Sequence, residues 1–184
     1  MNRKIVIIMV LALLVLLTFS AAAQAKGRSW TYKATLTELN GSGVAGVVEI
    51  KLVHGQLVVN VKATGLTPRR VHAQAIRGFA DGSPAGCPGP AADVNGDGWI
   101  TLAEGTPFFG KALLPLNPAP KASRKGSINF QRVYRGASLK ALDLDATPLT
   151  TRVVVLQGMD VSGQYTLEKY DPTIPVACGK IVRR

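Results

Sequence analysis

Short runs of β-forming residues, each closed by a turn, are the feature that most limits what this 184-residue chain can fold into. The clearest pair is residues 44–53 and 56–63, which are joined by the tight turn His54-Gly55. Along both runs apolar side chains alternate with polar ones, as in strands with one buried and one solvent-facing side. The 19 Gly and 11 Pro of the chain interrupt the sequence often, which favours many short elements.

The same pattern continues along the rest of the chain. Residues 138–144 are predicted to form one or two helical turns, and almost no other helix is expected. Many short strands with Gly/Pro turns are typical of an all-β, antiparallel sandwich or barrel. The predicted strands are residues 30–39, 44–53, 56–63, 70–77, 110–116, 127–134, 152–157 and 176–182.

The first 25 residues are organised as a secretory signal peptide. Arg3 and Lys4 precede an apolar run, residues 5–19, and Ala23-Gln24-Ala25 is a cleavage pattern. We expect cleavage, which leaves residues 26–184 as one domain that is secreted, periplasmic or on the cell surface. No later segment is apolar enough to span a membrane; the alternative is that the signal stays as an anchor, for which its apolar run is short. Removing Arg3 and Lys4 leaves 20 basic and 11 acidic residues, so the net charge falls from +11 to +9.

The chain has only two cysteines, Cys87 and Cys178, which are 91 positions apart. In an exported protein the simplest interpretation is a disulfide between them, because the compartment is oxidising. The alternative is two free buried thiols. Two cysteines are too few for a disulfide-dense scaffold or a four-cysteine zinc site.

Residues 93–104 fill the pattern of an EF-hand calcium loop along its whole length. Calcium binds several hard oxygen ligands around one point, and alternating side chains in a curled loop supply them. Gly98 stands at the sharp turn, where a positive φ is tolerated by glycine. The alternative is a metal-free surface turn. The predicted ligands are Asp93, Asn95, Asp97, Trp99 through its backbone carbonyl, Thr101 and Glu104.

The flanks of this loop differ from those of a calcium switch, which needs a helix on each side. The preceding residues 84–90 are rich in Pro and Gly, and Gly105 and Pro107 should stop a following helix after about one turn. We therefore expect structural calcium in a loop inserted into a β-fold, rather than calcium that signals.

Two segments resemble a known family. Residues 71–78, Val-His-Ala-Gln-Ala-Ile-Arg-Gly, and residues 175–181, Pro-Val-Ala-Cys-Gly-Lys-Ile, are similar to the CHRD domain and to the copper/zinc superoxide dismutases. The resemblance implies a Greek-key β-sandwich or flattened barrel over most of residues 30–182. It also implies that Cys178 of the closing segment pairs with a cysteine of a mid-chain loop, here Cys87. Secreted bacterial members of this group often have a calcium-type loop after the histidine-bearing strand.

The dismutase copper ligands are mostly missing. Where the group commonly has three histidines on one strand, this chain has His72, Ala75 and Arg77, and its only other histidine is His54. Copper redox chemistry needs several imidazoles. We therefore interpret His72 as a hydrogen-bonded strand residue and expect neither copper nor zinc. A general acid–base role for Asp143 and Asp145 is the alternative to a capped turn before Pro148, which we favour.

The basic excess is divided into small groups. In an exported protein, an anionic cell-wall polymer, a polysaccharide or a membrane surface could bind them, and the alternative is a solvated basic surface. Nucleic acid is not expected, because the protein is exported and has no aromatic–basic platform. The groups are Arg69-Arg70, Lys121/Arg124/Lys125, Arg132/Arg135 and Arg183-Arg184.

Three functions remain open from the sequence. The first hypothesis is a secreted, non-catalytic, calcium-binding β-sandwich module of the cell envelope or extracellular matrix. The second is a degenerate or active metalloprotein of the dismutase type. The third is a module that adheres to polyanions through its basic surface.

Overall fold

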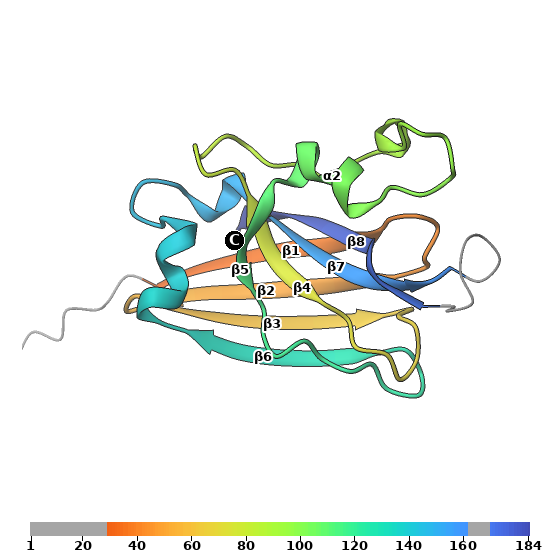
Figure 1. The fold of residues 1–184 in the computed structure, drawn as a ribbon. Helices are drawn as coiled ribbons and strands as arrows, with labels where there is room; N and C mark the ends of the chain where they lie inside the picture. The colour runs from red at the N-terminus through yellow and green to blue at the C-terminus, as the bar shows by residue number, and fades with distance from the viewer. Residues whose placement is uncertain (1–28, 162–169) are drawn as a thin grey trace, which may run out of the picture.

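The computed structural model describes residues 29–161 and 170–184, so the predicted signal segment and its cleavage site lie outside the described residues. Eight antiparallel strands form one sheet in the order β5-β4-β7-β8-β1-β2-β3-β6. The sheet curls on itself into a half-barrel (Figure 1). The predicted all-β, antiparallel fold class is therefore confirmed. The strands are β1 (Ser29–Glu38), β2 (Ala45–Val53), β3 (Gln56–Thr64), β4 (Gln74–Gly78), β5 (Lys111–Pro115), β6 (Ile128–Tyr134), β7 (Val153–Asp160) and β8 (Tyr170–Arg183).

Short helices occupy the connections. The eight-residue helix α2 (Leu102–Phe109) follows the calcium-type loop, and η1 (Pro90–Ala92) is a 3-10 turn that precedes it. The 3-10 segments η2 (Gly136–Leu142) and η3 (Leu149–Thr151) lie between β6 and β7. No helix among the described residues is long and apolar enough to cross a membrane.

Strands β1, β2 and β3 form an antiparallel meander, with the predicted hairpin of residues 44–53 and 56–63 at β2 and β3. Ile50 of β2 pairs with Val59 of β3 and Tyr32 of β1, and the alternating Val48, Ile50, Val59 and Val61 are fully buried. His54 and Gly55 both have positive φ, 49° and 69°, as a two-residue hairpin turn requires. Alternation in the sequence therefore predicted the buried face, and the tight turn at His54-Gly55 is present as expected.

Strand β8 is twice as long as the predicted segment 176–182. It pairs with β7 along one edge and with β1 along the other, so it joins the two halves of the sheet. Pro172 and Pro175 lie inside it, and the β7–β8 register shifts beside Pro175. Since proline cannot donate to a β-ladder, the shifted register lets it remain in the strand.

The molecule has two apolar clusters. The larger one fills the half-barrel and includes Ile50, Val61, Leu156 and Ile181. The smaller one lies on the outer face of β7 and β8, beneath residues 79–110, and includes Phe109 and Cys178. The long excursion that contains the calcium-type loop is therefore packed against the sheet through a core of its own.

Candidate metal centre

Asp93 is the centre around which the loop curls. Its Oδ1 accepts hydrogen bonds from the backbone N–H groups of Gly96 and Asp97, at 2.9 and 3.2 Å, and its Oδ2 accepts from that of Gly98 at 2.8 Å. Gly98 has a φ of +88°, which an L side chain rarely adopts. The first residue of the predicted calcium loop thus organises its next five residues by itself.

Asn95 and Asp97 continue the curl. The amide of Asn95 donates to Asp97 Oδ2 at 3.0 Å, while Asp97 N–H donates back to Asn95 Oδ1 at 2.9 Å. Trp99 N–H donates to Asp97 Oδ1 at 2.9 Å. The residues at the first, third, fifth and seventh positions are therefore adjacent in one turn of chain.

Glu104 closes the loop. Its Oε1 accepts from Val94 N–H at 3.2 Å, ten residues earlier, and its Oε2 accepts from the backbone and hydroxyl of Thr101 at 2.9 and 2.8 Å. These hydrogen bonds lower the pKa of the Glu104 carboxyl, and the one from the Thr101 backbone has the largest effect. The carboxyl is therefore charged at neutral pH. The last predicted ligand thus reaches back to the start of the loop.

Thr101 and Glu104 also start helix α2. Thr101 is the N-cap, and its side chain and that of Glu104 form a reciprocal capping box. The helix extends over eight residues with Pro107 inside it, which is longer than the single turn predicted from Gly105 and Pro107. The capping box and the burial of Phe109 compensate for the hydrogen bond that Pro107 cannot make.

Asn40, in the turn between β1 and β2, fixes the loop to the sheet. Its side-chain amide donates to Ile100 O at 3.0 Å and accepts from Ile100 N–H at 2.8 Å, as a neighbouring strand would. The same amide nitrogen donates to Pro175 O at 2.9 Å. Asn40 has a φ of 59°, which suits a turn residue, but nothing in the sequence signals a contact 60 residues away.

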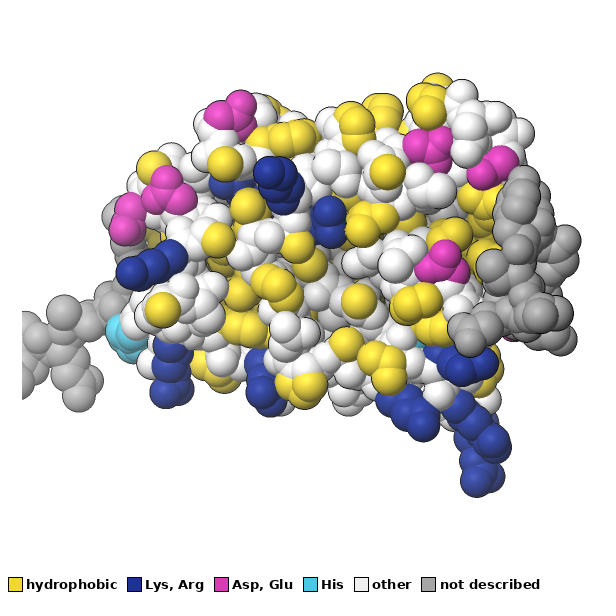
Figure 2. Space-filling view, in the orientation of Figure 1, with side chains coloured by type: hydrophobic (Ala, Val, Ile, Leu, Met, Phe, Trp, Pro, Cys, Tyr) yellow, Lys and Arg dark blue, Asp and Glu magenta, His cyan; other side chains and the backbone are white. Residues whose placement is uncertain are grey.

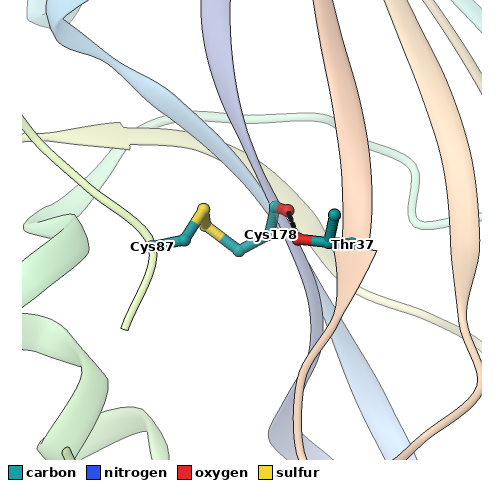
Figure 3. Close-up of a disulfide and its surroundings, with 3 residues drawn as sticks. All are labelled: Thr37, Cys87 and Cys178. Carbon is teal, nitrogen blue, oxygen red and sulfur yellow. Dashed lines mark hydrogen bonds between the residues drawn. A yellow bond between two sulfur atoms is a disulfide. The ribbon is translucent and has the colours of Figure 1, made fainter. Parts of the chain in front are cut away.

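A disulfide holds the approach to the loop. Cys87 and Cys178 are bonded, with their Cα atoms 5.7 Å apart, as the sequence predicted. Figure 3 shows the bridge joining the excursion to β8, where the Thr37 hydroxyl of β1 donates to the Cys178 carbonyl at 3.2 Å. Neither cysteine is free.

A buried arginine holds the far end of the excursion. Arg77 of β4 donates from Nε to Gly110 O at 3.1 Å, and its guanidinium lies 4.6 Å from the centre of the Phe109 ring. Burial lowers the pKa of Arg77 from its usual value. The excursion is thus fixed to the sheet near the start, the middle and the end.

The donor set fits calcium better than a transition metal. All six predicted ligands offer oxygen atoms, which calcium prefers, and none offers sulfur or imidazole. Throughout residues 29–161 and 170–184, no three His, Cys, Asp or Glu side chains lie close enough together to hold a metal ion. The loop curls, but its carboxylates accept hydrogen bonds from its own N–H groups and are not gathered around one point, so the ligand set stays a prediction.

The two histidines do not fit a copper centre. His72 is fully buried just before β4, where Nδ1 lies 3.1 Å from Gln157 O and Nε2 lies 3.0 Å from Thr67 O, so both ring nitrogens already face protein groups. His54 is exposed in the β2–β3 turn. The imidazoles that copper redox chemistry needs are not available from these two residues.

Asp143 and Asp145 lie at the other end of β1 from the calcium-type loop. They line a cavity of about 610 Å³ together with Trp30 and His54. Asp143 has a φ of 44°, and its backbone carbonyl accepts hydrogen bonds from the N–H groups of Ala146 and Thr147. These bonds form the predicted turn before Pro148.

Comparison with known proteins adds only a fold likeness. The chain matches no protein-family model and no curated protein. It is similar to the solved structure of Candida albicans superoxide dismutase 5 in its Cu(II) form, with 12% sequence identity and a TM-score of 0.45. The match covers 85% of this chain and 94% of that chain. It concerns the arrangement of strands, and the CHRD likeness remains one of short motifs.

Proposed function

We propose that this chain is an exported, non-catalytic, calcium-binding β-sandwich module of the cell envelope or extracellular matrix. The observation that supports it most is the loop from Asp93 to Glu104, whose six predicted ligands lie in one curled segment closed by the Glu104 carboxylate. When bound, calcium supplies charge neutralisation and a shared centre for these oxygen atoms. Its role is structural, because the loop is fixed to a sheet rather than placed between two mobile helices.

The anchoring of the loop supports a structural role. Ile100, Cys87 and Phe109 tie the excursion to the turn after β1, to β8 and to β4 respectively. A sensor loop must let its flanking helices move apart when calcium binds. Here η1 has three residues and α2 ends in the smaller apolar cluster, so the segments on both sides of the loop are already fixed. Calcium would rearrange only the side chains of the loop itself.

Export supports the same proposal. The amino-terminal residues predict a signal peptide, and a disulfide persists in oxidising compartments. Calcium is abundant outside cells, so a site with a dissociation constant of about 0.1–1 mM is useful there.

Elemental analysis of the secreted protein separates this proposal from the dismutase alternative. The protein is purified without chelator and dialysed against buffer that contains calcium, copper and zinc at equal concentration. We expect about one calcium per chain and no stoichiometric copper or zinc. The matched control is Asp93→Ala, which should lose the calcium. Stoichiometric copper bound by both the wild-type protein and Asp93→Ala, together with superoxide turnover, would favour the dismutase alternative over the proposal.

A further inference from the structure

Two basic groups, whose nearest members Arg70 and Lys121 are 51 positions apart in the sequence, lie side by side in the structure. Arg69 N–H donates to Ala122 O at 3.1 Å, and Ala122 N–H donates to Arg70 O at 2.8 Å. Val71 forms an antiparallel bridge with Lys121. The connections β3–β4 and β5–β6 therefore pair as a two-stranded ribbon, residues 66–72 with 120–127. The ribbon brings together five exposed cations: Arg69, Arg70, Lys121, Arg124 and Lys125.

The ribbon presents these charges on a fixed backbone. Its tip is a turn in which Ser123 N–H donates to Ser127 O at 2.9 Å, and the Ser123 hydroxyl accepts from Lys125 and Ser127 N–H groups at 3.2 Å. Arg69 has a φ of 61°, a conformation usually left to Gly or Asn.

The described residues form no ion pair with the charges of the ribbon. No carboxylate among the described residues lies within ion-pairing distance of the five side chains; the ion pair that those residues do contain, Arg184 with Glu49, lies elsewhere. The guanidinium of Arg70 lies 5.3 Å from the centre of the Tyr170 ring. Asp171, which follows Tyr170 in the chain, accepts hydrogen bonds through Oδ1 from the backbone N–H and the hydroxyl of Thr173. Figure 2 shows basic side chains along the lower edge, where these connections lie, and acidic ones mainly over the upper loops.

The form of the ribbon favours a polymer over a membrane. A peripheral membrane site combines cations with apolar side chains that enter the lipid. The exposed large apolar residues among those described are Val71, Val94, Phe108, Val133 and Val182, on separate elements, and only Val71 belongs to the ribbon. Five cations around a single exposed valine suit a ligand that carries repeated charges along its length. We propose that the ribbon is a docking site for a linear anionic polysaccharide, a role additional to calcium binding.

The test uses immobilised dextran sulfate, with uncharged dextran as the matrix control. The triple variant Lys121→Gln, Arg124→Gln, Lys125→Gln removes three ribbon charges. Its matched control, Lys51→Gln, Lys111→Gln, Lys140→Gln, removes three exposed charges from other elements. We expect the ribbon variant to bind at least about tenfold more weakly at low salt and with a shallower salt dependence, because fewer counterions are released. The control variant should lose less than about threefold by the same electrostatic argument.

Three results would overturn the proposal. Equal losses in the two variants would mean that net charge, rather than the ribbon, binds the polymer. Unchanged binding in the ribbon variant would place the contact elsewhere. Tighter binding to vesicles of phosphatidylcholine and phosphatidylserine than to dextran sulfate, lost in the ribbon variant, would make the ribbon a membrane site. Measurements with calcium and with chelator keep this test separate from that of the calcium loop, since the ribbon should bind equally in both.

Discussion

At the scale of single residues, Asn40 shows how a side chain can take the place of a strand. Ile100 is the eighth residue of the calcium-type loop, the position that is held through its backbone in paired EF-hand loops. Here the side-chain amide of Asn40 bonds to both the N–H and the carbonyl of Ile100. The same amide reaches Pro175 of β8. One side chain thus connects the loop to two parts of the sheet.

Replacing Asn40 by glycine should weaken calcium binding. Glycine keeps the positive φ of this position, so the substitution removes the amide without straining the turn. Loss of the two hydrogen bonds to Ile100, at about 1 kcal/mol each or less, should raise the calcium dissociation constant about tenfold. Isothermal titration with calcium measures the change. The matched control is Ser42→Ala, which removes two hydrogen bonds of the same turn, to Val176 O and from Val44 N–H, without touching the loop. Equal affinities for Asn40→Gly and Ser42→Ala would show that Asn40 does not position the loop.

At the scale of elements, the disulfide determines how firmly the excursion from β4 to β5 is held. Cys178 is fully buried in β8, and Cys87 lies six residues before Asp93. Ala85 N–H donates to Thr151 O and Gly86 N–H donates to Phe108 O, both at 2.9 Å. The bridge therefore acts together with backbone hydrogen bonds on the segment that leads into the calcium-type loop.

The double variant Cys87→Ser, Cys178→Ala should be less stable. The bridge closes a loop of 91 residues, which in the chain-entropy model stabilises the fold by roughly 4–5 kcal/mol. Urea unfolding measures the free energy, and hydrogen exchange should show the largest loss of protection over residues 79–110. Reduction of the wild-type protein is the control and should give a similar loss. A loss below about 1 kcal/mol would mean that the apolar cluster alone holds the excursion.

Local patterns in the sequence predicted the elements that depend on neighbours along the chain. Alternation gave β2 and β3 to within a residue, and the oxygen-donor spacing gave the curl around Asp93. The predicted β8 was too short, because Pro172 and Pro175 normally end strands and the register shift that accommodates them is a tertiary feature. The predicted helix α2 was also too short, because the burial of Phe109, another tertiary feature, offsets the effect of Pro107.

At the scale of the whole molecule, the acidic loop and the basic ribbon lie at different places in the fold. The calcium-type loop and its acidic residues lie on the excursion over β7 and β8, and the basic ribbon lies where the β3–β4 and β5–β6 connections pair. The sequence could not predict the ribbon, because Arg70 and Lys121 meet only once both crossing connections are in place. A basic ribbon and an acidic loop at separate places in the fold can bind two different ligands.

The most direct test of the account is a melting curve with calcium and with chelator. At a calcium concentration ten times the dissociation constant, binding should stabilise the wild-type protein by about 1.4 kcal/mol. For a domain of this size that raises Tm by about 3–6 °C. Asp97→Ala should show no difference between calcium and chelator, and Val94→Ala, an exposed loop residue that is not a predicted ligand, should respond like the wild type. A wild-type protein that melts at the same temperature in saturating calcium and in chelator would contradict the central claim.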